Sequence, residues 1–176
     1  MSEPVEGLSE ASAHLAVALA EGKPTPPDAA LRTRLLASLG RPGTYGVFAD
    51  RLARLFDLPL EEATALCASL ESGEAWKPFL LPGVEMMPVT AGPKLAGAVA
   101  TLVRLQPGAA FPEHTHRGEE TMVVLDGGFR EAAEGGAEVW RGEELSRGDG
   151  TDHTFVALPG RPCIAAAVIT GYAEFR

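Results

Sequence analysis

The spacing of apolar residues divides the chain into two parts that meet near residue 82. Before that point, apolar residues recur every three or four positions, which is the spacing of one buried face of an α-helix. After residue 83 they form short runs separated by glycine, proline and aspartate, which is typical of strands joined by turns. The pattern therefore predicts a helical N-terminal region at residues 1–82 and a β domain at residues 83–176.

Four helices are predicted in the first part. The first covers residues 8–18, and the second covers residues 28–40, with Asp28 as the N-cap and Gly40 at the end. The third and fourth cover residues 45–55 and 60–70. Prolines interrupt this region, so it is not predicted to fold independently.

Short apolar runs define the strands of the second part. A polar, glycine-rich turn is predicted at residues 131–138. Strands at this density with no helices between them predict an all-β sandwich or barrel. The predicted strands lie within residues 83–89, 95–105, 121–127, 137–140 and 163–169.

Composition and charge exclude several classes of partner. The 176 residues are 45% hydrophobic and 22% charged, as in a soluble globular protein. The formal net charge of −9 argues against nucleic acid, which requires an excess of basic residues. No apolar run approaches the roughly 18–20 residues that span a bilayer, and the acidic N-terminal sequence does not resemble a secretory signal. We therefore expect a cytoplasmic protein with no nucleic-acid or membrane partner.

Two of the four histidines lie one residue apart, at positions 114 and 116. Side chains at i and i+2 of a strand point to the same face, so His114 and His116 are predicted to project together. Glu120 follows after a short turn and adds a carboxylate, which makes three ligands of a metal site. Of the two remaining histidines, only His153 lies in the β domain, whereas His14 lies in the helical region.

Other polar residues near this cluster have simpler interpretations. Glu113 and Glu119 are expected in solvent, and Arg117 is expected in a turn or an ion pair. Asp149 and Asp152 flank His153, where they would either orient its ring or simply shape a turn. The two cysteines, at positions 67 and 163, form no paired motif and are interpreted as small buried apolar residues.

The spacing of these residues resembles the two sequence motifs of the cupin family. Gly108, five residues, His114-x-His116, three residues, Glu120, six residues and Gly127 match the first motif in full. The second motif has His153 in place but departs at Gly148, where proline is usual, and at Ala157, where asparagine is usual. The resemblance covers residues 83–170 and implies a jelly-roll β-barrel that holds a metal ion with His114, His116, Glu120 and His153.

The HxHRGxE core and the GxFR that follows it also resemble the cupin domain of ChrR-type anti-sigma factors. In that family the domain binds zinc with three histidines and one glutamate and takes part in an oxidative-stress response. A separate N-terminal module of the form His-x3-Cys-x2-Cys grips the sigma factor. Here Ala18 and Glu21 follow His14 at the two cysteine positions, so that module is absent and sigma binding by that route is not expected.

Two functions stay open at this point. Four protein ligands complete a tetrahedral zinc site, which fits a regulatory or stress-sensing protein that acts through a protein partner or a small ligand. The same ligands leave two positions open on octahedral iron, manganese or nickel, which fits a small cupin enzyme such as a dioxygenase or isomerase. No group of arginine, lysine or tyrosine residues for an anionic substrate is evident near the motif, which favours the first function. No catalytic residue is assigned, and a homodimer is expected because cupins commonly pair their barrels.

Overall fold

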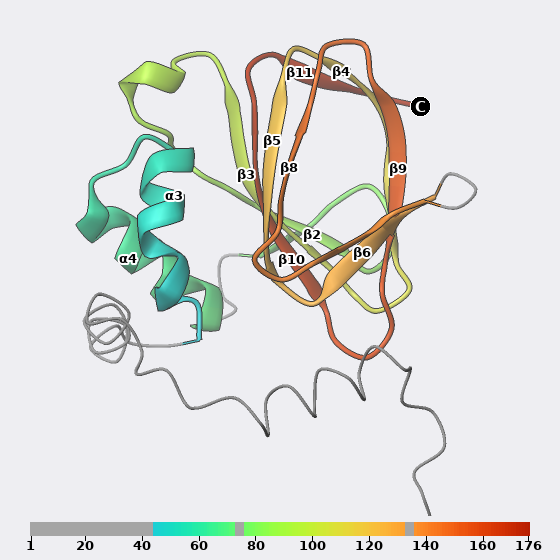
Figure 1. Ribbon diagram of the computed structural model, residues 1–176, viewed down its shortest axis with the longest axis horizontal. Coiled ribbons are helices and arrows are strands. Elements are labelled where there is room, and N and C mark those ends of the chain that lie inside the picture. The colour runs from blue at the N-terminus through green and yellow to red at the C-terminus, as the bar shows by residue number, and fades with distance from the viewer. Residues whose placement is uncertain (1–43, 73–75, 133–135) are drawn as a thin grey trace, which may run out of the picture. The chain divides into compact units, whose positions relative to one another are not determined.

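The computed structural model describes residues 44–72, 76–132 and 136–176 (Figure 1). The helices predicted at residues 8–18 and 28–40 lie outside this part of the chain. No helix within it is long and apolar enough to cross a membrane.

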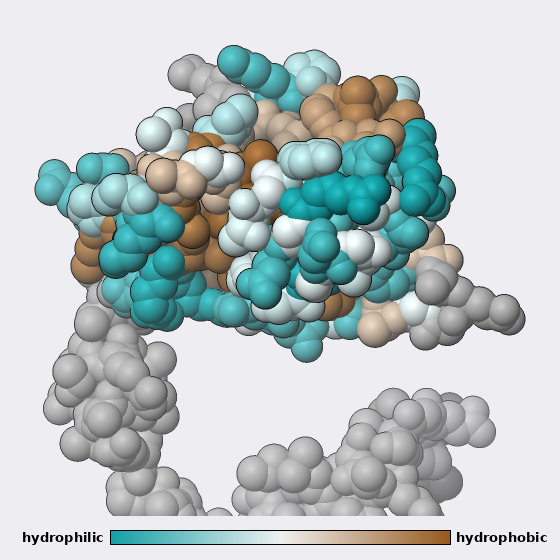
Figure 2. Space-filling model, turned by 90° about the horizontal axis from the view of Figure 1, so that it is seen from above, coloured by the Kyte–Doolittle hydropathy of each residue, from teal (hydrophilic) through white to brown (hydrophobic). Residues whose placement is uncertain are grey.

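Helices precede the strands, as the apolar spacing predicts. A 3-10 turn, η1 (Gly46–Phe48), leads into α3 (Ala49–Leu55), and α4 (Leu60–Ser72) follows. Both helices lie against one side of the strands (Figure 1). Apolar side chains pack between the helices and the strands (Figure 2). Phe56 and Leu52 are fully buried there, because the three-and-four spacing gives each helix one apolar face.

The strands form two antiparallel sheets that face each other (Figure 1). Their orders are β1-β2-β3-β10-β5-β8 and β11-β4-β9-β6-β7. The fold is therefore mainly β, a jelly-roll barrel preceded by a short helical region, as predicted. The division of the chain at residue 82 stays a prediction. The strands are β1 (Lys77–Pro78), β2 (Val84–Pro88), β3 (Val99–Leu105), β4 (Ala110–Arg117), β5 (Glu120–Asp126), β6 (Gly128–Glu131), β7 (Glu138–Trp140), β8 (Glu144–Arg147), β9 (Asp152–Ala157), β10 (Cys163–Ile169) and β11 (Tyr172–Phe175), with a 3-10 turn η2 (Pro93–Leu95) before β3.

Strand β10 shows how the sheet of β10 becomes buried on both faces. Ile164, Ala166 and Val168 pack on the side of the helices. Cys163 and Ala165 point to the interior of the barrel, where they meet the other sheet. Alternate residues of a strand point to opposite faces, so a continuous apolar run suits a strand that is covered on both sides.

Gly127 of the first motif and Gly150, three residues before His153, serve turns for different reasons. Gly127 has φ +59°, and a Cβ there would lie 2.5 Å from the carbonyl oxygen of Pro162. Gly150 has φ +76° but no atom within 4 Å of such a Cβ. Both positions favour glycine for its left-handed backbone, but only at Gly127 would a side chain also be obstructed.

Candidate metal centre

A β-bulge in β4 turns its two histidines into the barrel. The register with β9 pairs Phe111 with Phe155 and His114 with His153, so β4 carries one extra residue between these two pairs. The bulge lies between Phe111 and His114, a stretch that begins with Pro112, and the missing backbone N–H of a proline is tolerated at a bulge. Phe111 and His114 consequently line the same interior cavity, although they are an odd number of residues apart.

The four predicted ligands come from both sheets. His114 and His116 lie on β4, and His153 faces His114 from the neighbouring strand β9. Glu120 begins β5, which pairs with β8 and β10 in the opposing sheet. The turn after β4 thus carries the chain into the other sheet rather than onto a strand paired with β4, and Glu120 approaches the histidines from across the barrel.

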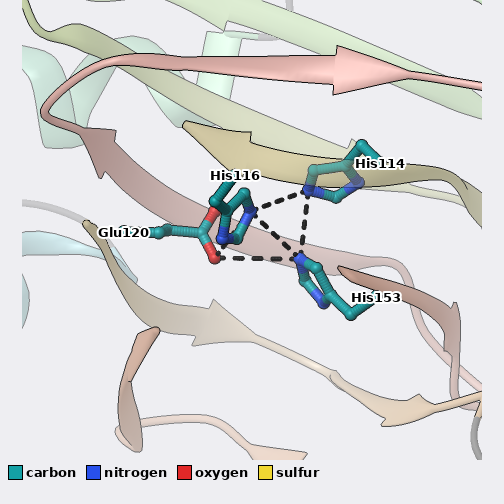
Figure 3. A group of neighbouring side chains, drawn as sticks. All are labelled: His114, His116, Glu120 and His153. Carbon is teal, nitrogen blue, oxygen red and sulfur yellow. Dashed lines mark hydrogen bonds and ion pairs between the residues drawn. The ribbon is translucent and has the colours of Figure 1, made fainter. Parts of the chain in front are cut away.

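The structure brings these four side chains together in the interior (Figure 3). One potential ligand atom from each lies within 4.8 Å of the others. The Nε2 atoms of the three histidines are 2.9, 3.0 and 3.2 Å apart. Oε2 of Glu120 lies 3.6 Å from Nε2 of His116 and 3.9 Å from Nε2 of His153.

The outer nitrogen of each ring faces a hydrogen-bond acceptor. Nδ1 of His114 donates to the carbonyl oxygen of Pro112 at 2.8 Å. The hydroxyl of Thr151 donates to the carbonyl of Gly148, so its oxygen is free to accept from Nδ1 of His116 at 3.2 Å. Nδ1 of His153 lies 3.4 Å from Oε2 of Glu131. With the Nδ1 hydrogens of His114 and His116 directed outward, these two rings point their Nε2 atoms toward each other and toward His153.

Burial keeps two of these rings neutral. It lowers the pKa of His116 to about 4, with the neighbouring His153 and His114 acting in the same direction. Burial also lowers the pKa of His114. The pKa of Glu120 is raised by burial, which the positive charge of Arg147 opposes. A lone pair is what a metal ligand must offer, so the neutral rings are ready to bind a cation.

The donor set fits a divalent metal ion. Nitrogen atoms about 2.0–2.1 Å from a zinc ion lie about 3.3–3.4 Å apart in a tetrahedron, and about 2.9 Å apart at neighbouring corners of an octahedron. The observed separations of 2.9–3.2 Å lie in this range. A cation bound among these ring nitrogens and the carboxylate would be stabilised by all four groups.

Two charged residues that the sequence analysis did not assign complete the surroundings. Nη1 of Arg147 donates to Oε2 of Glu120 at 3.0 Å, and Nη2 of the same residue donates to Glu131. Glu131 was predicted to begin a polar turn but is the last residue of β6. Arg147 is thus a basic residue beside the motif, and both of its carboxylate contacts are internal.

The remaining polar residues lie mainly on the surface. Glu113, Glu119 and Arg117 are exposed, as predicted, and Arg117 pairs with Glu174 at 2.8 Å. Asp149 accepts a hydrogen bond from the backbone of Gly118, and Asp152 accepts from Thr115 and Arg176. None of these hydrogen bonds involves His153. Asp149 lies in the turn before β9, as the turn interpretation expects, whereas Asp152 is the first residue of β9.

An apolar cavity of about 250 Å³ adjoins the cluster inside the barrel and is lined in part by His114 and Glu120. Most of its wall is aromatic or aliphatic, and its aromatic rings are those of Phe79, Phe111, Phe155, Tyr172 and Phe175. No lysine or arginine is among the described residues that line it. An apolar cavity of about 150 Å³ holds benzene, so this one has room for a somewhat larger uncharged molecule.

Comparison with protein families identifies one match, which covers more than half of the chain. Residues 69–166 match the family described as the ChrR cupin-like domain. Among the curated proteins, none matches the chain significantly.

Solved structures with a similar fold include the anti-sigma factor ChrR in complex with SigE from Rhodobacter sphaeroides. That match has 25% identity and a TM-score of 0.51, and covers 90% of this chain and 76% of the other. An acetylacetone dioxygenase from Acinetobacter johnsonii has 15% identity and a TM-score of 0.52, with 58% and 72% covered. A cupin-like protein of unknown function from Ralstonia eutropha has 20% identity and a TM-score of 0.47, and the match covers 53% of this chain and 59% of that protein.

Proposed function

The chain belongs to the ChrR cupin-like domain family, and from this premise we propose that it is a metal-binding regulatory protein. In this proposal His114, His116, Glu120 and His153 hold a zinc ion, for which iron, manganese and nickel are the alternatives. The protein acts in regulation or stress sensing through a protein partner or a small ligand. The observation that carries the proposal is the convergence of three Nε2 atoms and one carboxylate in the barrel interior.

Zinc is favoured by the number and kind of these donors. Two or three histidines with one carboxylate are a common zinc donor set, and four protein ligands leave no position for water in a tetrahedral site. When bound, the ion would supply a positive charge that links the two sheets through Glu120 and the histidines. Loss or exchange of the ion, or oxidation near it, would then change the positions of side chains in both sheets.

The interior cavity defines the small ligand that this protein would accept. Its apolar wall, with no basic residue among the described lining, favours an uncharged ligand over an anion of appreciable size. An uncharged, mainly apolar molecule would fit and would contact His114 and Glu120. The protein partner stays open, because the neighbour in complex with SigE is only 25% identical. The homodimer and the cytoplasmic location stay predictions.

A second candidate function is a small metal-dependent enzyme, and the same cavity favours it. An octahedral ion held by these four residues would keep two positions open, and a cavity beside them would admit a substrate. The choice depends on whether the bound metal carries water in addition to the four side chains.

Metal analysis of protein purified without an affinity tag tests the proposal. We expect close to one zinc ion per chain, and a His114→Ala variant from the same preparation should lose it. X-ray absorption at the zinc edge should give four nitrogen or oxygen neighbours. Six neighbours around iron or manganese would replace the regulatory function by the enzymatic one, and a native protein that neither carries nor takes up a metal would refute both.

A further inference from the structure

A continuous series of side-chain contacts borders the proposed metal centre on the side of β6 and β8. Glu131 uses its two carboxylate oxygens separately, since Oε1 accepts from Arg147 and Oε2 lies 3.4 Å from Nδ1 of His153. Arg147 in turn uses its two terminal nitrogens separately, one toward Glu131 and the other toward Oε2 of Glu120 at 3.0 Å. Glu131 therefore contacts one proposed ligand directly and another through Arg147.

These contacts also connect the two sheets. Glu120 and Arg147 are directly opposite each other on β5 and β8. Glu131 and His153 belong to β6 and β9, which pair in the other sheet. The side chain of Arg147 is only 11% exposed and that of Glu131 only 20%. An arginine this buried requires compensating charge, and two carboxylates supply it.

We propose that Glu131 is a positioning residue of the metal centre, which fixes the ring of His153 and the carboxylate of Glu120 in the orientations that bind the ion. The inference rests on the proposed metal binding and adds a fifth residue to it. A carboxylate that accepts the outer N–H of a ligand histidine holds the tautomer and the ring orientation that the metal needs. Nδ1 of His153 is buried and has no hydrogen-bond partner among the described residues, and Oε2 of Glu131 lies 3.4 Å from it, so Glu131 needs only a small movement to accept that N–H.

The second contact of Glu131 acts on Glu120. Arg147 binds the same oxygen, Oε2, that lies nearest to the histidines. Without Glu131, the full positive charge of Arg147 would rest on Glu120 alone and would compete with the metal for that oxygen. With Glu131 present, the guanidinium is shared between two carboxylates, and Glu120 stays available to the ion.

Removal of the carboxylate tests the inference directly. In Glu131→Ala, both contacts are lost, and we expect zinc and cobalt affinity to fall about 10- to 100-fold. In Glu131→Gln, the amide has one acceptor oxygen for two donors, so a smaller loss is expected. Glu131→Asp should restore part of the affinity. The matched control is Glu138→Gln on the paired strand β7, where Glu138 forms an ion pair with Arg130 away from the centre.

The readout is competitive metal titration together with the visible absorption spectrum of the cobalt-loaded full chain. A change in the cobalt spectrum of Glu131→Ala, absent from Glu138→Gln, reports altered ligand positions and would not follow from a general loss of stability. Native-like affinity and spectrum in both Glu131→Ala and Glu131→Gln would overturn the inference. So would unfolding of both variants, because the carboxylate would then serve the fold rather than the centre. Failure of the native protein to bind cobalt or zinc would instead contradict the proposed function itself.

Discussion

Strands β4 and β10 are both buried, but for opposite physical reasons. Every residue of β10 is apolar and buried between the helices and the barrel interior, so its burial stabilises the fold by about 25 cal/mol for each Å² removed from water. Strand β4 buries His114, Thr115 and His116 instead. Burial of imidazoles brings little stability and disfavours their protonated form, as the lowered pKa of His116 indicates. The comparison shows that burial of the histidines of β4, which could bind a metal, contributes less to stability than burial of the apolar residues of β10.

The largest expected effect is on metal binding by the histidines of β4. A His114→Ala and His116→Ala double variant removes two of the four proposed ligands. Structural zinc sites contribute about 10–16 kcal/mol in total, so the variant should lose at least about 5 kcal/mol of zinc-binding free energy. Isothermal titration with a competing chelator measures this. His14→Ala, which changes the histidine in the N-terminal region, is the control and should bind like the native protein. Tight binding by the double variant would place the metal elsewhere.

A substitution in the apolar core beside β10 should lower the free energy of unfolding and leave metal binding unchanged. Phe56 is fully buried between the helices and the sheet of β10. Phe56→Ala should lower the free energy of unfolding by about 3–5 kcal/mol, because it removes a large side chain and leaves a cavity. Urea unfolding of the metal-free protein measures this. The folded variant should retain native zinc affinity, and a large loss of affinity would show that the two regions are coupled.

Acidification should lower the free energy of unfolding of the metal-free protein, because burial disfavours the protonated form of His116. Its pKa falls from 6.5 to about 4 on folding, so the unfolded chain binds more protons between these two values. Stability of the metal-free protein should therefore decrease as the pH falls from about 6.5 to 4, by about 3 kcal/mol from this residue. Urea unfolding at pH 7 and pH 4.5 measures the change. A His116→Gln variant should show a smaller decrease, and equal slopes for the two proteins would contradict the assignment.

The smallest effect is expected at Arg117, which follows His116 in the sequence but points to solvent. Its ion pair with Glu174 is exposed on both sides. Arg117→Ala should change the free energy of unfolding by less than about 1 kcal/mol. Zinc affinity should be the same as in the native protein. Thermal unfolding and metal titration of the single variant check both values. A loss of affinity would mean that Arg117 influences the centre although its side chain points to solvent.

Local patterns were sufficient to predict two of the helices, several strands and the placement of two histidines on one strand face. The helices near residues 45–55 and 60–70 and the strand at 163–169 follow from apolar spacing, because each presents a face or a run that must be buried. The i, i+2 spacing placed His114 and His116 on one face, and the structure brings His153 beside them.

The surroundings of the centre depend on pairings that no local pattern contains. Strands β6 and β8, with the sequences GFRE and ELSR, lack a clear apolar alternation and were not predicted as strands. Glu131 and Arg147 lie at their ends, so both residues were missed. They meet only because the two sheets face each other, which is a consequence of the tertiary fold.

The bulge between Phe111 and His114 makes the site depend on backbone geometry as well as on residue type. These two residues are an odd number of positions apart, yet both line the interior cavity, because the bulge absorbs one residue of β4. With the same sequence and no bulge, strict alternation from Phe111 would carry Glu113 and Thr115 inward and both histidines to the surface. All four proposed ligands would then be present in the sequence and the centre would still be lost. In the evolution or design of such barrels, the odd spacing from Phe111 to His114 and the bulge are therefore inherited together.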